Sequence, residues 1–534
     1  MSSTVTNPDP DVAPEPAGRR RFSRAWLLRF VVAAASGFTL YLSFAPRPLW
    51  WLAPLAFTAF ALVVHGRRFR GAFGYGFVFG VAFFLPLLTW LLDFLGPGFG
   101  PWPWLGLAMA LAVYLGFGGA FATVVWNLPL GPLWAALVII ALETPRAWFP
   151  FGGFPWGRVA FSQPEGAFLP LASIGGAPLV GLAVVLTGFG LAAVCLRVKA
   201  AGPRRSLVAA SVLTLVPALA GLAVWPTIGT EAQDGELTIA TVQGNAPDIG
   251  LALEGRRDEL RSNHLAESAR LLEQLKASNT KIDLLIWPET AMAMRSGDTG
   301  VDQMVRDYGI QAIIGALVRL PDGSAQNSAL VWDPVTGPGQ RYAKQQLVPF
   351  GEYVPARELA ELVTPFVDSV ANMTPGDGAN SALSVAGTKV GVFICYETAF
   401  DYPARESVAD GAELLVVPTN NAWYGPGEMS YQQLAMSRLR AVEHGRAVVV
   451  SATSGVSAIV APDGSITAST SLFTADSLVG RVPLRQQTTL SDLLGVTTEY
   501  GLLALAFAGV AGGFVLRFRT RRASVAKATR EAAG

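Results

Sequence analysis

The sequence of 534 residues contains few of the residue types that build metal sites and disulfide frameworks. Its two cysteines, Cys195 and Cys395, lie far apart and form no CxxC pair, and its three histidines lie in unrelated contexts. The sequence also lacks a glycine-rich phosphate-binding loop and an HExxH motif. We therefore expect no metal and no cofactor.

Charged residues are also scarce. They make up 15% of the chain, against 51% hydrophobic residues, and the formal net charge is +1. Lysines and arginines cluster at the ends of apolar runs rather than along one face, so we expect no nucleic-acid partner. This composition is too apolar for an ordinary soluble enzyme and indicates a membrane protein.

Long apolar runs, in contrast, are abundant. A helix needs about 20 mostly apolar residues to cross a bilayer. We therefore predict seven spans over residues 26–226 and an eighth transmembrane helix over 497–518. The fifth span is short, because Glu143, Pro145 and Arg146 crowd its end. The apolar runs lie near 26–45, 49–65, 71–95, 103–127, 132–146, 176–196, 206–226 and 497–516.

The basic residues predict the orientation of these spans. If both chain ends lie on one side, that side also receives the connections richest in lysine and arginine, and the positive-inside rule makes it cytoplasmic. Residues 1–25 are then expected to form a disordered cytoplasmic tail, and 519–534 a basic cytoplasmic tail. The large segment 227–496 lies outside the cytoplasm.

The outer connections are rich in tryptophan, whose ring suits the membrane interface. One of them, the loop 147–175, contains too much proline and glycine for a transmembrane helix. It is either a re-entrant or interfacial segment or a stiff connector with aromatic anchors. The tryptophans in question are Trp50, Trp51, Trp102, Trp104, Trp148 and Trp156.

Within residues 227–496, strand-like runs alternate with helix-like runs. This alternation is typical of α/β layers around a sheet. Strands are predicted for residues 237–242, 283–287, 312–318, 329–332, 388–394, 413–417 and 447–452, and helices for 256–277 and 431–444.

Three polar residues stand where such layers place a ligand crevice, beside the C-terminal ends of strands. Glu289 follows the strand 283–287, Cys395 ends the strand 388–394, and Lys344 lies among uncharged residues. Taken singly, each has another explanation: a surface turn for the glutamate, a small core residue for the cysteine and a solvated charge for the lysine.

Together these residues suit acyl transfer. A thiol with a pKa near 8.5 becomes a nucleophile when a carboxylate takes its proton, as Glu289 would do for Cys395. A cation such as Lys344 favours the thiolate and then the oxyanion of a tetrahedral intermediate, with the backbone N–H of Tyr396 as a second donor.

The motifs around the three residues resemble those of the nitrilase (carbon–nitrogen hydrolase) superfamily. They are Trp287-Pro288-Glu289-Thr290-Ala291, the stretch 342–355 and Ile394-Cys395-Tyr396-Glu397. With the apolar spans and the downstream segments 420–425 and 440–446, the chain is similar to the apolipoprotein N-acyltransferase family over almost its whole length.

This resemblance implies a fold and a reaction. The fold is an extracytoplasmic αββα domain on eight helices, on the periplasmic face of a bacterial inner membrane. In the reaction, Cys395 accepts a fatty acyl chain from a phospholipid as a thioester, and the α-amine of a diacylglyceryl-cysteine on a lipoprotein then takes it as an amide. Glu289 acts as the base and Lys344 as the oxyanion stabiliser.

The resemblance also implies supporting residues. Glu352, Tyr396 and Glu397 match positions associated with activity, the two glutamates orienting Lys344 and the nucleophile loop. Trp423 and Tyr424 match a substrate-binding loop at the mouth of the site.

One stretch departs from the family pattern. Family members carry a tryptophan shortly after Val242-Gln243-Gly244, whereas residues 248–252 of this chain contain no aromatic side chain. Downstream, Glu443, His444 and Arg446 are interpreted as packing a helix end through charge pairs.

Two other functions stay open at this point. One is a membrane-tethered amidase that uses water as the second nucleophile, and the other is a non-catalytic partner of another membrane enzyme. An intact Glu289, Lys344 and Cys395 argues against the partner, since a scaffold needs none of the three.

Overall fold

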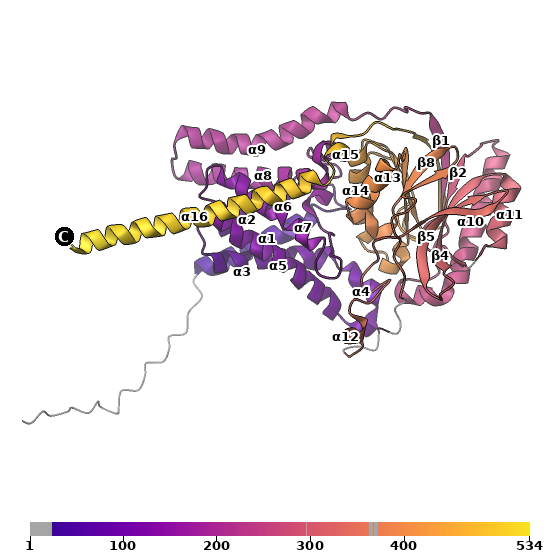
Figure 1. Cartoon of the computed structure of the whole chain (residues 1–534), viewed down its shortest axis with the longest axis horizontal. Coiled ribbons are helices and arrows are strands. Elements are labelled where there is room, and N and C mark those ends of the chain that lie inside the picture. The colour runs from indigo at the N-terminus through magenta and orange to yellow at the C-terminus, as the bar shows by residue number, and fades with distance from the viewer. Residues whose placement is uncertain (1–23, 295, 363–366, 368–371, 534) are drawn as a thin grey trace, which may run out of the picture.

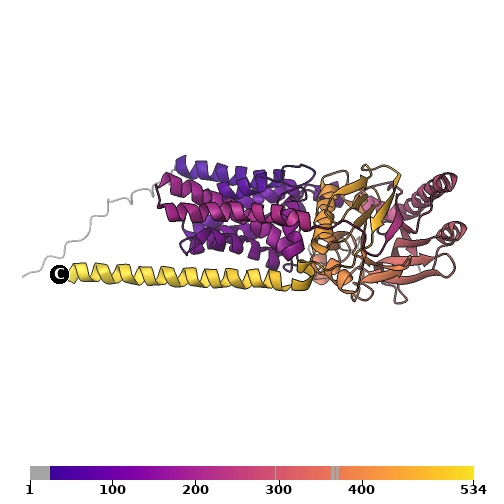
Figure 2. The ribbon, with the colours of Figure 1, turned by 90° about the horizontal axis from the view of Figure 1, so that it is seen from above.

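The computed structural model describes residues 24–533 apart from 295, 363–366 and 368–371. The molecule has two parts along its long axis, a bundle of apolar helices and a domain of two β-sheets flanked by helices (Figures 1 and 2). The predicted fold class, an α/β domain joined to a region of apolar helices, is confirmed.

Six helices among the described residues are long and apolar enough to cross a membrane. They are α1 (Arg24–Leu42), α3 (Phe69–Leu87), α5 (Trp102–Val125), α8 (Ala172–Lys199), α9 (Arg204–Val224) and α16 (Thr497–Ala533). Two shorter apolar helices, α2 (Leu52–Val64) and α6 (Gly131–Ala141), pack in the same bundle. Each of the eight predicted apolar runs therefore coincides with a helix.

Small residues allow α3 and α5 to pack closely. A methyl group added at Gly80 would lie 2.7 Å from the Cα of Ala112, and one at Gly76 would lie 2.4 Å from the carbonyl oxygen of Leu115. Close backbone approach at such positions is how helices gain contact in a membrane, where lipid offers no hydrophobic driving force.

Two predicted spans are divided in the structure. The run 71–95 forms α3 and a separate short helix, α4 (Trp90–Leu95), with Pro86 in the last turn of α3. Proline lacks the N–H that would continue the helical hydrogen bonds. The fifth run forms α6 and the single turn α7 (Glu143–Arg146).

The chain ends also differ from expectation. Residues 1–23 of the predicted tail lie outside the described residues, and α1 already begins at Arg24. At the other end, α16 continues as one helix through the basic residues after 518 and extends beyond the bundle (Figure 1). Arginine, lysine and alanine are good helix formers, so the basic segment continues the apolar helix.

The second part contains two sheets. The seven-stranded sheet has the order β13-β1-β2-β4-β5-β6, with β3 paired to β4, and the six-stranded sheet has the order β12-β11-β10-β9-β8-β7. Strands of the first are β1 (Glu236–Gln243), β2 (Leu284–Ile286), β3 (Met292–Met294), β4 (Gln311–Arg319), β5 (Ala325–Asp333), β6 (Gly337–Ala343) and β13 (Asp476–Pro483). Strands of the second are β7 (Ala382–Val385), β8 (Thr388–Val392), β9 (Leu414–Thr419), β10 (Val448–Ala452), β11 (Ala458–Val460) and β12 (Ile466–Ser469).

Side-chain alternation along the strands builds four layers. In β2, Leu284 and Ile286 point between the sheets, while Leu285 packs against the helices on the outer face. In β9, Val416 points between the sheets and Val417 packs outward. The covering helices are α10 (Arg257–Ala277) and α11 (Thr299–Tyr308) on the first sheet, and α13 (Tyr402–Ala409) and α14 (Met429–His444) on the second. The short helices α12 (Arg357–Glu361) and α15 (Leu490–Leu494) complete the domain.

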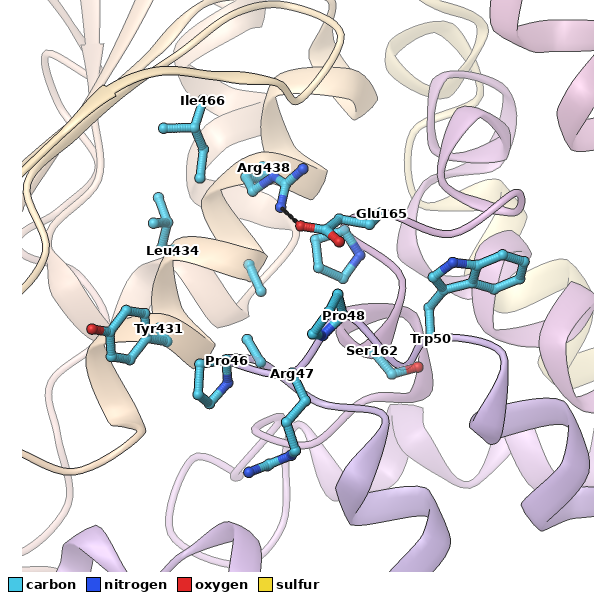
Figure 3. A pocket seen from close by; sticks show the side chains of 13 residues that line it. Pro46, Arg47, Pro48, Trp50, Ser162, Glu165, Tyr431, Leu434, Arg438 and Ile466 are labelled. Atoms are coloured by element: carbon cyan, nitrogen blue, oxygen red, sulfur yellow. Dashed lines mark hydrogen bonds and ion pairs between the residues drawn. The ribbon is translucent and has the colours of Figure 1, made fainter.

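The two parts meet along the layer of α13 and α14, which lies between the second sheet and the bundle (Figure 1). Met436 and Leu439 of α14 belong to the same buried cluster as the bundle helices. An ion pair of 3.2 Å between Glu165 of the bundle and Arg438 of α14 lies at this junction (Figure 3). The core is therefore continuous from the bundle into the domain.

The loop 147–175 lies largely at this junction. Trp156 is buried and its indole N–H donates to Gln432 of α14 at 2.7 Å, so it does not anchor the protein at a membrane interface as we expected. Trp148 is 64% exposed and Trp102 is 74% exposed, as interfacial anchors require. The loop therefore contains both buried aromatic residues, such as Trp156, and exposed rings, such as Trp148.

Candidate active site

The three predicted site residues lie together. Glu289 and Lys344 come after β2 and β6 of the first sheet, Cys395 comes after β8 of the second, and all three line one cavity of about 40 Å³. This volume holds roughly one water molecule. The ends of the strands therefore meet as the layered fold predicts.

Lys344 is at the centre of a buried charge cluster. Its Nζ lies 2.9 Å from Glu289 Oε1 and 2.9 Å from Glu352 Oε1, and its side chain is 1% exposed. Burial alone would lower the pKa of the lysine, but the two carboxylates outweigh it and raise the pKa well above the usual value. Lys344 is therefore a fixed cation.

Two asparagines hold the carboxylates in place. The amide of Asn327 donates to Glu289 Oε1 at 2.6 Å and to Glu352 Oε1 at 2.8 Å. The backbone N–H of Asn420 donates to Glu289 Oε2 at 2.8 Å. Both oxygens of Glu289 are thus directed, which fixes its orientation toward the cavity.

Cys395 begins the 3₁₀ helix η7 (Cys395–Ala399) and is 3% exposed. Its φ of 52° lies in the left-handed region, which is rare for a residue other than glycine and marks a strained turn. Burial, and then the charge of Glu289, raise the pKa of the thiol to about 12, while Lys344 opposes them. The resting cysteine is therefore a thiol.

Glu397 connects the turn that begins at Cys395 to the loop that contains Lys344. Its Oε2 accepts the backbone N–H of Ile394 at 2.5 Å, and its Oε1 accepts the N–H of Gln345 at 2.7 Å and the hydroxyl of Tyr342 at 2.9 Å. Burial raises its pKa to about 7, and the donated N–H bonds limit the rise. It does not line the cavity.

Tyr396 points away from the cavity. Its hydroxyl donates to the carbonyl oxygen of Gly153 at 3.0 Å, and its ring lies in the core cluster of the bundle. The structure therefore places this predicted supporting residue on the bundle side of the turn.

Aromatic side chains cover the cavity. Trp423 and Tyr424 of the 3₁₀ helix η8 (Asn421–Tyr424) line it together with Phe94 of α4. The ring of Phe94 lies 6.1 Å from that of Trp423 and 5.2 Å from that of Tyr424. Tyr424 also contacts Trp90 edge-on at 5.0 Å, so a bundle-side helix closes the site.

The stretch that lacks the family tryptophan leads into a 3₁₀ helix, η5 (Gly250–Arg256). Leu253 packs with Ala246, Leu260 and Ala422 in a small buried cluster. An aliphatic contact with Ala422 of η8 therefore adjoins Trp423 in the chain.

Sequence reasoning missed Asn327, Asn420, Phe94, Arg257 and Met373, all of which line the cavity. Asn420 follows β9 directly, so its place at a strand end was a usable signal. Asn327 sits within β5 and Phe94 comes from the bundle, and neither position has a local sequence signature.

Glu443, His444 and Arg446 lie elsewhere. Glu443 pairs with Arg440, and His444 Nδ1 lies 2.6 Å from Asp492 Oδ1. Arg446 donates to the carbonyl oxygen of Ala412 at 2.9 Å and to that of Gln487 at 2.7 Å, so the expected charge pair is a carbonyl contact at this position.

Two family models match the chain. The apolipoprotein N-acyltransferase N-terminal domain matches residues 36–190, and carbon-nitrogen hydrolase matches residues 238–490. With the two packed sheets and the cysteine, glutamate and lysine at their strand ends, the second match defines a carbon–nitrogen hydrolase domain attached to a bundle of apolar helices.

Curated relatives match most of the chain. A protein named apolipoprotein N-acyltransferase from Mycolicibacterium smegmatis is 37% identical over 509 residues, which cover 91% of this chain and 84% of the relative. One of the same name from Azotobacter vinelandii is 30% identical over 518 residues, covering 92% and 96%. Among solved structures, an amidase from Nesterenkonia sp. is 21% identical with a TM-score of 0.35, covering 48% of this chain and 94% of that chain.

The chain belongs to the apolipoprotein N-acyltransferase family. The resemblance that the motifs predicted is therefore confirmed, and the apolar helices agree with a membrane protein.

Proposed function

We propose that this protein transfers a fatty acyl chain from a phospholipid, through a thioester on Cys395, to the α-amine of an N-terminal diacylglyceryl-cysteine of a lipoprotein. The observation that supports it best is the buried cluster of Cys395, Glu289 and Lys344 in a family member whose site is closed by a bundle-side helix.

In the first half-reaction the thiol attacks the ester carbonyl of the phospholipid. Glu289 takes the thiol proton as the sulfur–carbon bond forms, which a thiol with a pKa of about 12 requires. Lys344 stabilises the oxyanion. The ester carbon–oxygen bond then breaks, and the leaving lysophospholipid alkoxide receives the proton from Glu289.

In the second half-reaction the α-amine attacks the thioester. Glu289 accepts a proton from the amine, Lys344 again stabilises the oxyanion, and the carbon–sulfur bond breaks as the amide forms. The proton returns to Cys395, so the enzyme is regenerated. Glu352 and Asn327 hold the side chains of Lys344 and Glu289 in position throughout.

The bundle suits these substrates because both carry acyl chains. Each methylene that stays out of water saves about 0.8 kcal/mol, so a site beside apolar helices avoids most of the cost of extracting a lipid. We place the domain on the periplasmic face, because the basic residues cluster at the opposite ends of the helices. The contacts of Trp423 and Tyr424 with Phe94 must open to admit an acyl chain, since the cavity holds only about 40 Å³.

Mass spectrometry tests the proposal directly. The purified protein is incubated with phosphatidylethanolamine and examined for an acyl adduct, and a diacylglyceryl-cysteine peptide is then added and its N-acylation followed. The adduct should form in the wild type and in Cys195→Ser, whose exposed thiol lies on α8 and does not line the cavity, and should be absent in Cys395→Ser. An adduct that water releases at the same rate with or without peptide would indicate a hydrolase instead.

A further inference from the structure

The nucleophile turn has two sides. Cys395 lies in the core between the two sheets, whereas Tyr396, Ala399 and Phe400 lie in the core cluster of the bundle. The turn is therefore shared between the domain and the bundle.

A buried arginine reaches this turn from behind. Arg440 of α14 is 0% exposed, and its Nε donates to the carbonyl oxygen of Thr398 at 3.0 Å. The hydroxyl of Thr398 donates in turn to the carbonyl oxygen of Cys395 at 2.8 Å. Two hydrogen bonds therefore connect the guanidinium to the peptide of the strained nucleophile.

The same arginine connects the turn to the bundle. Its Nη1 lies 2.7 Å from Asp401 Oδ1, and Asp401 Oδ2 accepts from Arg158 of the bundle loop at 2.7 Å. Arg158 lies 3.6 Å from Glu143 of α7. Arg440 also pairs with Glu443 on its own helix. The contacts form an unbroken buried path from α7 to Cys395.

Such a network is a poor device for stability alone, because well-packed apolar residues are often as stable as buried ion pairs. Its specific contribution is geometric, since a guanidinium presents donors in fixed directions. We propose that Arg440 is a positioning residue that holds the Cys395 turn in its left-handed conformation and, through Asp401 and Arg158, makes that geometry depend on the bundle. The effect on acyl transfer rests on the proposed function, whereas the effect on the thiol does not.

Three kinds of variant test the proposal. Arg440→Met combined with Glu443→Gln removes the donor and one carboxylate together, so Asp401 keeps its pair with Arg158. Thr398→Val removes the second hydrogen bond, and Thr398→Ser restores the hydroxyl. Arg438→Gln is the matched control, because Arg438 lies on the same helix and pairs with Glu165 of the bundle without touching the turn (Figure 3).

Two readouts separate positioning from folding. In a Cys195→Ser background, the rate of Cys395 alkylation by iodoacetamide is measured across pH, together with kcat and KM for acyl-enzyme formation from phosphatidylethanolamine. Melting temperature and elution volume in detergent report folding. We expect at least about a tenfold loss in kcat at unchanged KM, with an altered alkylation profile, in the Arg440 double variant. Thr398→Val should change both readouts in the same direction, with recovery in Thr398→Ser.

Wild-type values in the folded Arg440 double variant would overturn the proposal, as would equal losses in Arg438→Gln. If the double variant does not fold, equal behaviour of Thr398→Val and Thr398→Ser overturns it. If no acyl adduct forms even in the wild type, the proposed function fails, and the alkylation profiles still decide whether Arg440 positions the thiol.

Discussion

The two halves of the site are held in different ways. Glu289, Lys344 and Glu352 are fixed by one another and by Asn327, all within the sheet domain. The turn of Cys395 is fixed from behind, by α14 and by residues in the core cluster of the bundle. The half with the proposed base is therefore self-contained, whereas the half with the proposed nucleophile packs against the bundle.

This difference has a physical reason. A buried cluster of one lysine and two carboxylates is stable only when every charge has a partner at short range. Its side chains must therefore stay in place. A strained turn persists only when its surroundings hold it on every side. On the side that faces the bundle, the residues that hold it belong to the bundle. The arrangement would let a change in the membrane region reach the nucleophile before it reaches the base.

Removal of the base is expected to have the largest effect and tests the self-contained half. Glu289→Gln should lower acyl transfer by roughly 10²–10⁴-fold, as for loss of a general base. Burial and then the charge of Glu289 raise the pKa of the Cys395 thiol, so the variant should lower that pKa. Alkylation by iodoacetamide should then begin at lower pH than in the wild type. A profile displaced to higher pH contradicts the proposed charge balance.

Lys344→Met also tests the half of the site that is held within the sheet domain. It should lower acyl transfer by roughly 10²–10³-fold, as for loss of an oxyanion donor. It should also lower the free energy of unfolding by about 3–5 kcal/mol, because Glu289 and Glu352 lose their common buried partner. Denaturant unfolding measures the second effect. In Lys344→Met with Glu352→Gln, stability should recover and activity should not; recovery of both would remove the role of the lysine.

The fold was predictable where periodicity is strong. The apolar runs and the strands at 237–242 and 312–318 match helices and strands of the structure, because a membrane span and a strand buried on both faces each have a plain hydrophobic pattern. The strands β3, β6, β7, β11, β12 and β13 were missed. They are short or partly exposed, and much of their pairing is set by the neighbouring strand rather than by their own residues.

The site was predictable where polar residues interrupt apolar strand ends. Glu289, Lys344 and Cys395 were named on that ground, and the structure places them around one cavity. Asn327 and Arg440 were not, because their partners lie far away in sequence: Asn327 contacts Glu289, and Arg440 contacts Asp401 and Thr398. Long-range contacts of this kind leave no trace in local composition.

Glu397 tests the connection between the halves. Its carboxylate accepts from Ile394 beside the nucleophile and from Gln345 beside Lys344. Glu397→Gln replaces an acceptor oxygen by a donor and leaves a buried N–H unpaired, at a cost of about 1–3 kcal/mol. We expect acyl transfer to fall by roughly 5–150-fold on the same principle. Glu406→Gln, at an exposed carboxylate that also contacts Gln345, is the control and should change little.

Tyr396→Phe has the smallest expected effect and bears on the bundle half alone. The variant keeps the ring in the bundle core and removes the hydrogen bond to Gly153, worth about 0.5–1.5 kcal/mol. If this contact helps hold the turn, the acylation rate of Cys395 should fall by roughly two- to tenfold, with the phospholipid KM unchanged. Tyr353→Phe removes a hydroxyl bond of 2.8 Å to Phe151 of the same loop without touching the turn, and it should leave the rate unchanged. Equal losses in the two variants would mean that the rate depends on the loop 147–175 as a whole and not on its hydrogen bond to Tyr396. The contrast between the two halves of the site would then lose this support.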